Sequence, residues 1–471
     1  MTLQVWFTYS PQITSQGAMA GTIAAQATKG PYMQERRVRV ALIGFGTVGS
    51  GVARLLLEQG SAIRERTGVA IELAAVVDTD ATRPRPVALP PGLLTSDLDR
   101  VLNDESIEIG IELIGGTTVA RQVQHRLLEA GKHVVTANKA LLAEYGPELY
   151  VAARKADRCI AFEGSCAGGV PIILALRSGL TANRIRAMYG ILNGTCNYIL
   201  SNMTARNEDF HTALKEAQKK GYAEADPTLD IDGSDTAHKL AILGSLAFGC
   251  EIPYDAIPVE GIEGIAVEDI RYGLEMGYVI KLLAIGERED SRISLRVHPA
   301  FIHRDTPLAR VNGPFNAISV FGDAVGNTLF YGRGAGMMPT ASAVVGDLVQ
   351  VATGISQRLF ETQRLTSVEQ TRCLLEDIGG ITSRFYVRIM AKDKPGVVAT
   401  YGGILGKHGI SISGALQHEG VGPDSTVPVV ITTHPTQQAN MTAALEELSR
   451  TDVISGEPAC IRIVDIPEDQ D

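Results

Sequence analysis

The chain has 471 residues, 45% of them hydrophobic, and a formal net charge of -10 at pH 7. This length exceeds one ordinary core, and at roughly 100 to 200 residues per domain it predicts about three domains. The acidic balance argues against a nucleic-acid partner, whose phosphates favour a basic protein face. No apolar run reaches the roughly 18 residues that a membrane-spanning helix needs, so we expect no membrane contact.

Six cysteines lie far apart in the sequence and show neither a CxxC spacing nor the ligand pattern of a zinc site. They are Cys159, Cys166, Cys196, Cys250, Cys373 and Cys460. This usage predicts reduced thiols and a cytoplasmic location.

The first 36 residues are rich in Thr, Gln, Ala and Gly and have no hydrophobic period. They also lack the basic region and apolar core of a signal peptide. We expect residues 1–36 to form a disordered tail. An alternative is that translation starts at Met33.

A glycine-rich loop follows the first predicted strand, which begins at Val38. The loop reads Gly44, Phe45, Gly46, Thr47, Val48 and Gly49, and a helical pattern follows it. A GxGxxG motif between a strand and a helix is typical of dinucleotide binding. The next strand, residues 71–77, ends at Asp78, which is placed to bind the adenosine ribose of NAD. Arg83 and Arg85 follow closely, and they could instead receive the 2′-phosphate of NADP.

Further strands at 109–114, 133–136 and 160–162 alternate with helical stretches such as 119–130. This alternation predicts an α/β fold with a parallel sheet covered on both faces. Thr117 and Lys139 each follow the end of a strand, where ligands gather in such sheets.

A second glycine-rich turn, residues 163–171, carries one carboxylate, that of Glu163. Its carbonyl and carboxylate oxygens would suit a hard monovalent cation. The alternative is a plain loop that crosses between domains. The pattern then predicts a helix at 172–179, a strand at 185–192, a turn at Asn193 that opens a helix, and a helix at 210–220.

An acidic run, residues 221–239, follows Gly221. It contains Glu224, Asp226, Asp230, Asp232 and Asp235, and Lys239 lies four residues after the last of them. Residues four apart share one face of a helix. Asp235 and Lys239 could therefore orient a small polar substrate and supply a proton. The alternative is a solvated loop with a weak surface ion pair.

The remaining sequence predicts two more units. Paired strands at 278–286 and 293–298, with a third at 316–320, indicate an open α+β sheet. A glycine-rich segment at 332–336 then leads into a helix at 340–351. After a polar helix and linker at 357–380, elements in the order βαββαβ occupy residues 381–467.

Several of these segments together resemble homoserine dehydrogenase over residues 38–354. They are GFGTVG at 44–49, GGTT at 115–118, TANK at 136–139, EGSCAGGVPI at 163–172, GILNGTCNYIL at 190–200 and GYAEADPTLDIDGSDTAHKLAIL at 221–243. The resemblance implies NAD- or NADP-dependent interconversion of L-aspartate 4-semialdehyde and L-homoserine. It also implies a Rossmann-type domain at 37–165, completed by 332–356, and a catalytic and dimerisation domain at 166–331.

The resemblance also implies roles for individual residues. Lys239 would donate the proton, with Lys139 as the rival donor, and Asp235 would hold both Lys239 and the substrate. Substrate contacts would come from Glu224, Tyr222, Gly194 and Thr195. Gly221 and Gly334 would lie against the cofactor. Glu163 and the carbonyl groups of Cys166, Gly168 and Val170 would bind a structural sodium ion.

The C-terminal unit resembles an ACT domain, and the pathway that the first resemblance implies makes L-threonine its expected effector. An ACT fold used only for dimerisation is the alternative. Either a homodimer or a homotetramer is expected. A different class of function, that of a non-catalytic dinucleotide-binding sensor, is disfavoured because Lys239, Asp235, Glu224 and Lys139 are all present.

Overall fold

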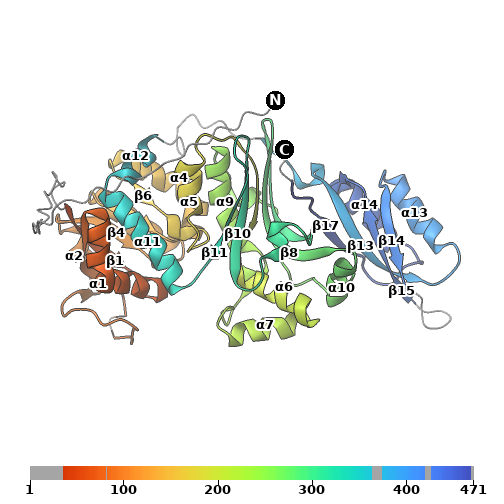
Figure 1. Cartoon of the computed structure of the whole chain (residues 1–471), viewed down its shortest axis with the longest axis horizontal. Helices are drawn as coiled ribbons and strands as arrows, with labels where there is room; N and C mark the ends of the chain where they lie inside the picture. Colours follow the sequence, from red (N-terminus) through yellow and green to blue (C-terminus); the bar gives the residue numbers. More distant parts are fainter. Residues whose placement is uncertain (1–35, 81, 363–373, 419–425, 468–471) are drawn as a thin grey trace, which may run out of the picture. The chain divides into compact units, whose positions relative to one another are not determined.

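A computed structural model describes residues 36–80, 82–362, 374–418 and 426–467 (Figure 1). The predicted disordered tail therefore lies outside the described residues, apart from Arg36, as do Met33 and Cys373. No helix in the described ranges is both long enough and apolar enough to cross a membrane.

The first unit is a six-stranded parallel sheet with the strand order β3-β2-β1-β4-β5-β6. Its strands are β1 (Arg36–Ile43), β2 (Val69–Val77), β3 (Leu94–Thr95), β4 (Ile107–Glu112), β5 (His133–Thr136) and β6 (Ile160–Ala161). Its helices are α1 (Thr47–Thr67), α2 (Asp99–Leu102), α3 (Thr118–Glu129) and α4 (Lys139–Lys155), and α11 (Met337–Ala352) joins them from later in the chain. The predicted Rossmann-type fold is confirmed.

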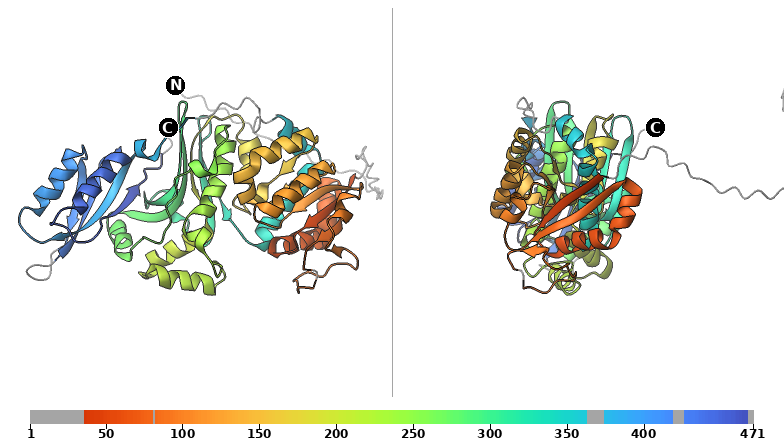
Figure 2. Two further views of the ribbon diagram at one scale, coloured as in Figure 1. Left: turned by 180° about the vertical axis from the view of Figure 1, so that it is seen from behind. Right: turned by 90° about the vertical axis from the view of Figure 1, so that its left-hand side faces the viewer.

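Helices cover both faces of this sheet (Figures 1 and 2). Right-handed crossovers on either side of β1 place α1 and α3 on opposite faces. α11 packs against α1, and α3 packs against α4. β1 is fully buried from Val40 to Leu42, as expected for a strand between two helical layers.

The glycine-rich loop after β1 requires glycine at two positions. Gly44 has φ +99°, and a Cβ atom there would lie 2.6 Å from the Leu113 carbonyl. A Cβ atom at Gly49 would lie 2.1 Å from the Gly44 carbonyl oxygen. These contacts bring the start of α1 close to the sheet, which leaves the helix N-terminus open toward a ligand.

The second unit is an antiparallel sheet with the strand order β11-β10-β7-β8-β9. Its strands are β7 (Ile185–Ile191), β8 (Tyr278–Glu289), β9 (Arg292–His303), β10 (Phe315–Gly322) and β11 (Gly326–Arg333). The main helices of this unit are α6 (Gly194–Arg206), α7 (Phe210–Lys219), α8 (Thr228–Ile231), α9 (Ser234–Phe248) and α10 (Val267–Glu275). Short helical segments are η1 (Glu163–Ser165), α5 (Ile172–Leu174), the π-helix η2 (Ala175–Gly179), η3 (Tyr254–Ala256) and η4 (Pro307–Arg310).

The open sheet differs from the sequence prediction in two ways. The β8–β9 hairpin extends well past the predicted strands, because both strands stay paired up to Glu289 and Arg292. β11 was not predicted, since the glycines at its C-terminal end, residues 332–336, were read as a loop. The helix predicted at 172–179 is a short α-helix that continues into the π-helix.

The C-terminal unit has the predicted βαββαβ order. Its elements are β13 (Thr382–Lys392), α13 (Val397–Lys407), β14 (Ile412–Gln417), β15 (Thr426–Thr433), the short β16 (Thr436–Gln437), α14 (Gln438–Ser449) and β17 (Ala459–Ile463). α12 (Ile355–Thr362), β12 (Leu374–Leu375) and η5 (Ile378–Gly380) precede them. The strands are ordered β17-β13-β15-β14. The predicted ACT fold is confirmed.

The C-terminal sheet is continuous with the open sheet. β17 pairs in parallel with β9 through Arg462 and Ile463, and β12 also pairs with β9. The two predicted domains therefore share one 11-stranded sheet. Sequence reasoning did not anticipate this pairing, because a strand's pattern does not reveal its neighbour.

Beside this junction, a buried ion pair joins the C-terminal unit to α10 of the second unit. Arg388 on β13 contacts both carboxylate oxygens of Asp269 on α10, at 2.5 and 2.9 Å. The Tyr386 hydroxyl donates to the same carboxylate at 2.8 Å. Asp269 is 1% exposed, so its charge depends on these donors.

Replacing Arg388 by Met should therefore destabilise the protein. We expect a loss of about 3–5 kcal/mol in the free energy of unfolding, because the Asp269 carboxylate would stay buried without its counter-charge. Denaturant unfolding measures this loss. The double variant Asp269→Asn/Arg388→Met should recover most of it. The exposed control Arg450→Met should stay within about 0.5 kcal/mol of the wild type, and an equal loss in that control would contradict the assignment.

Candidate functional site

The candidate site is built around the carboxylate of Asp235, which lies between two lysines. Lys239 Nζ is 2.6 Å from Asp235 Oδ2, and Lys139 Nζ is 2.7 Å from Asp235 Oδ1. Asp235 and Lys239 are one turn apart on α9, as the spacing predicted. Lys139 is the first residue of α4 in the parallel-sheet unit. The fold therefore joins both predicted proton donors through one carboxylate.

Local turns fix the starts of the two helices. Gly233, at φ +90°, precedes α9, and the Asp232 carboxylate accepts a hydrogen bond from Ser234 N at 2.8 Å. Asn138 caps α4 by accepting from Leu141 N, and its amide also donates to the Gly116 carbonyl at 2.7 Å. The TANK segment is thus tied to the GGTT turn.

The two lysines occupy different environments. The Lys239 side chain is 8% exposed and also donates to the Leu192 carbonyl at 2.6 Å. The Lys139 side chain is 41% exposed. Lys139 therefore reaches solvent, whereas Lys239 lies beneath it.

We call Lys139, Asp235 and Lys239 the triad, and their opposite charges stabilise one another. Burial opposes ionisation of Asp235, but the ammonium groups of Lys239 and Lys139 hold its pKa well below the usual value. Burial also disfavours the charged form of Lys139, but the Asp235 carboxylate outweighs it and raises the pKa of Lys139. Asp235 thus stays ionised and Lys139 stays protonated near neutral pH.

Sequence reasoning missed Asn193 and understated Asp230. The Asn193 amide donates to Asp230 Oδ1 at 2.7 Å and to Asp235 Oδ2 at 2.9 Å. Its carbonyl oxygen caps α6 by accepting from Cys196 N. Asp230 was named only as a member of the acidic run, but it reaches the site through Asn193, and burial followed by the Asp235 charge raises its pKa. The Asn-Gly turn at a helix start was the available signal.

The predicted substrate residues form a second group near the start of α6. The Thr195 hydroxyl donates to the Tyr222 carbonyl at 2.8 Å, and the Tyr222 ring lies 4.7 Å from that of Tyr198. Gly194 lies close to the Pro314 carbonyl, where a Cβ atom would come within 2.9 Å. Glu224 is exposed.

Most of the predicted cofactor residues lie at the carboxyl ends of the parallel strands, whereas Gly334 directly follows β11 of the antiparallel sheet and Gly221 follows α7. Asp78 accepts a hydrogen bond from Phe45 N at 2.8 Å and is paired with Arg85 at 3.0 Å. Arg85 also packs over the Phe45 ring, 5.3 Å from its centroid, and donates to the Phe45 carbonyl. Thr117 precedes α3. Gly221 has φ +73° and ends α7.

The predicted sodium loop is largely buried, and its one carboxylate, that of Glu163, lies beside the carboxylate of Asp347 on α11. Glu163 is 7% exposed and accepts from Ile173 N and Leu174 N at 2.9 and 2.7 Å. Glu163 N donates to the Asp347 carboxylate. Burial raises the pKa of both acids, and Glu163 also raises that of Asp347. The Val170 carbonyl accepts from Ile172 N. Within the described ranges, no group of three or more His, Cys, Asp or Glu side chains could hold a metal ion.

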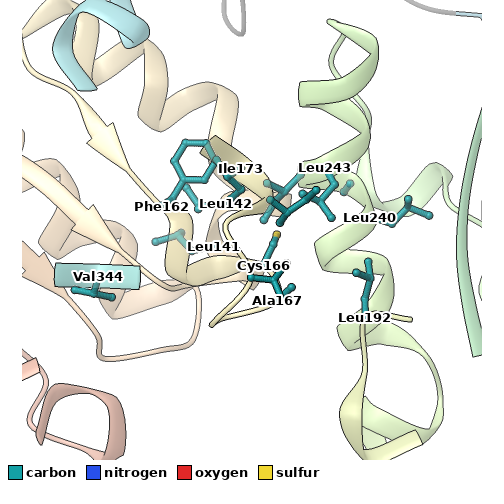
Figure 3. Close-up of a cluster of buried hydrophobic side chains, with 14 of the residues drawn as sticks. Leu141, Leu142, Phe162, Cys166, Ala167, Ile173, Leu192, Leu240, Leu243 and Val344 are labelled. Atoms are coloured by element: carbon teal, nitrogen blue, oxygen red, sulfur yellow. The ribbon is translucent and has the colours of Figure 1, made fainter. Parts of the chain in front are cut away.

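Apolar side chains surround the contact between this loop and α9 (Figure 3). The Cys166 thiol donates to the Lys239 carbonyl of α9 at 3.9 Å, and Leu141 and Leu142 lie on the side away from α9 (Figure 3). Cys159, Cys166, Cys196 and Cys460 are free thiols, but Cys250 is disulfide-bonded. The prediction of reduced thiols is wrong at Cys250, because sequence spacing does not show which cysteines meet in the fold.

Comparison with known proteins gives a consistent picture. The family model described as homoserine dehydrogenase matches residues 171–349, its NAD-binding domain model matches 44–163, and the ACT domain model matches 385–450. The homoserine dehydrogenase of Synechocystis sp. is 42% identical and covers 91% of this chain and 99% of its own. That of Pseudomonas aeruginosa is 42% identical and covers 90% and 98%. A solved homoserine dehydrogenase from Thiobacillus denitrificans is 41% identical, covers 91% and 99%, and has a TM-score of 0.85.

The Asp235→Asn variant should lower the pKa of Lys139. Without the carboxylate charge, burial would favour the neutral amine of Lys139. Repulsion from the Lys239 ammonium, which shares Asp235, would act in the same direction. The pH dependence of Lys139 acylation, followed by mass spectrometry, measures this change. The acylation curve should shift to lower pH than in the wild type. The exposed Lys215 serves as the internal control, and a curve for Lys139 that does not move would contradict the assigned coupling.

Proposed function

The chain belongs to the homoserine dehydrogenase family, and from this premise we propose that it interconverts L-aspartate 4-semialdehyde and L-homoserine. It is an NAD(P)-dependent oxidoreductase that acts on a CH–OH group. The observation that carries the proposal is the Lys139–Asp235–Lys239 triad, which lies where the parallel-sheet unit meets α9.

The triad supplies what aldehyde reduction requires. The bound cofactor supplies or accepts a hydride at the carbon of the reacting group. When that carbon gains a hydride, negative charge develops on its oxygen. A lysine ammonium stabilises this charge and donates the proton that completes the alcohol. In the reverse direction the neutral lysine accepts the hydroxyl proton, so oxidation should become faster as pH rises.

Lys239 is our proposed proton donor. Asp235 and the Leu192 carbonyl hold its ammonium in a fixed position, which favours a precise transfer. Lys139 binds the same Asp235 carboxylate, so it is the rival donor. Because it is more exposed than Lys239, it could also pass a proton from solvent back to the site.

Substrate recognition would use the groups near the start of α6. The backbone of Gly194 and Thr195 opens this helix, and a helix N-terminus favours the substrate carboxylate. Tyr222 lies beside it through the Thr195 hydroxyl. The exposed carboxylate of Glu224 would bind the substrate ammonium.

Arg85 bears on the choice between NAD and NADP. A carboxylate at the end of β2 favours NAD because it repels a 2′-phosphate. Here the Asp78 carboxylate is already paired with Arg85 at 3.0 Å. This pairing supports the use of NADP as well as NAD. Gly221 and Gly334 would contact the nicotinamide half of the cofactor.

A structural sodium ion fits the 163–170 loop. The adjacent buried carboxylates of Glu163 and Asp347 favour a nearby cation, and the carbonyl groups of Cys166, Gly168 and Val170 lie in the same loop. These loop residues would hold the ion. The ion would stabilise the loop and take no part in the reaction.

Dimerisation and feedback inhibition complete the proposal. β11 is an edge strand whose Leu329 and Tyr331 are 39% and 56% exposed, which supports a homodimer or a homotetramer built on this sheet. L-Threonine is the proposed effector of the ACT domain, and threonine, methionine and isoleucine biosynthesis is the pathway that the proposed reaction would serve.

A chain of contacts supports this regulation. Arg462 on β17 is 3.0 Å from Glu260. Glu260 N donates to the Val297 carbonyl on β9, and Ile262 N donates to the Ile231 carbonyl just before α9. A shift of β17 would therefore reach the segment that carries Asp235.

Lys239→Ala should lower kcat for homoserine oxidation by about 10²–10⁴-fold, because a positioned general acid or base contributes a factor of this size. Lys139→Ala should cost less if Lys239 is the donor. Initial rates with both NAD and NADP, between neutral and alkaline pH, measure these effects. Lys215→Ala, which removes an exposed lysine on α7, is the matched control. Near-normal turnover in Lys239→Ala would refute its role, and no oxidation by the wild type would refute the activity.

Arg462→Met should weaken inhibition by L-threonine while leaving kcat unchanged. Removal of the Arg462–Glu260 ion pair breaks the side-chain link between β17 and the 258–262 segment, so the effector should act less strongly on the active site. Inhibition curves for the wild type, Arg462→Met and the control Arg450→Met measure this. Equal inhibition of all three would contradict the proposed route.

A further inference from the structure

The carbonyl group of Leu192 binds two side chains at once. It accepts from Lys239 Nζ at 2.6 Å and from the Asn316 amide Nδ2 at 2.9 Å. Asn316 is 1% exposed and lies on β10, more than 70 residues after Lys239 in the sequence. A carbonyl oxygen has two lone pairs, and these two donors use both of them.

The position of Leu192 explains why it needs the second donor. The antiparallel pairing of β7 with β10 ends at Ile191, which pairs with Ala317. Leu192 is the next residue, and its carbonyl lies beyond the regular ladder. The Asn316 side chain thus takes the place of a ladder hydrogen bond and holds this carbonyl against β10.

The loop on the cofactor side packs against the same amide. A Cβ atom at Gly334 would lie 2.0 Å from both Cγ and Nδ2 of Asn316. Glycine is therefore required at 334 by the amide itself. Asn316 joins three parts of the site: the end of β7, the segment that includes Gly334, and the ammonium of Lys239.

The oxygen of the Asn316 amide lacks a hydrogen-bond donor. Asn316 Oδ1 is buried and has no hydrogen-bond partner among the residues that the structure describes. A buried acceptor without a donor is unfavourable. An apolar side chain would avoid that penalty, so the contribution of Asn316 lies in its Nδ2 donor and the carbonyl that it holds.

We propose that Asn316 is a positioning residue for proton transfer, which acts through the Leu192 carbonyl to fix the ammonium group of Lys239. The Leu192 carbonyl limits the directions in which the ammonium can turn while it remains bonded to Asp235. The part of this proposal that concerns proton transfer rests on the proposed function. The part that concerns the position of Lys239 does not.

The first test measures Lys239 directly and needs no enzyme activity. Asn316→Ala removes the donor, and Asn316→Leu removes it while filling the volume, so one variant serves if the other is poorly folded. Loss of one hydrogen bond corresponds to about a tenfold change, so we expect competitive acylation of Lys239, read by mass spectrometry, to be about tenfold faster. Unchanged acylation of Lys239 in the folded variants would overturn the proposal.

The second test asks whether the effect passes through Lys239. Asn316→Ala should lower kcat for homoserine oxidation by about tenfold or more, since a small misplacement of a reacting group is costly, and it should leave the KM for the cofactor unchanged. In a Lys239→Ala background it should cost nothing further. An equal loss in both backgrounds, or a loss confined to the cofactor KM, would overturn the proposal.

Asn183→Ala is the matched control. Asn183 also lies against a glycine, Gly322 at the other end of β10, and its amide oxygen accepts from Ala324 N and Val325 N. The control variant should leave both the acylation of Lys239 and kcat unchanged. If the wild type does not oxidise homoserine, the proposed function fails, while the acylation test still decides the role of Asn316.

Discussion

The site depends on one buried carboxylate that must stay ionised between two ammonium groups. Removing a charge from water is costly, and an unpaired Asp235 would take up a proton instead. Lys239 and Lys139 prevent this, and they come from different units of the fold. Docking of α9 onto the parallel-sheet unit and assembly of the charged triad are therefore the same event. In an isolated second unit Asp235 would keep Lys239, one turn away on α9, but it would lose Lys139.

The polar groups around the triad extend this constraint into the backbone. Asn193 links Asp230 to Asp235 and caps α6, while the Leu192 carbonyl holds Lys239. Two of these contacts use backbone groups that regular structure leaves unpaired: the Cys196 N–H at the start of α6 and the Leu192 carbonyl just after β7. The site thus forms where regular secondary structure stops, which explains why small backbone shifts there would change its chemistry.

The sequence predicted much of this arrangement, for identifiable reasons. Asp235 and Lys239 could be paired because the helical period brings residues four apart together, and the glycines at 44–49 have steric requirements that mark their turn. The contact of Lys139 with Asp235 required the tertiary fold. The sequence pattern did not predict the roles of Asn316 and of the Leu192 carbonyl, because a backbone carbonyl has the same chemistry at every residue. β11 was missed because the glycines at 332–336 favoured a loop, although half-buried and exposed residues alternate along its second half.

The C-terminal unit also has a structural role, because it pairs with one edge of β9. One edge of β9 pairs with β8 along its whole length, and the other edge is covered by β12 and β17. Without residues 374–467 that second edge would stay paired only at Val297, through residues 258–260. The unpaired N–H and C=O groups on either side of Val297 would form a template for association with another chain. The ACT domain therefore also covers an edge of the catalytic sheet. An enzyme shortened to its first two units would be prone to aggregate even if its active site were complete.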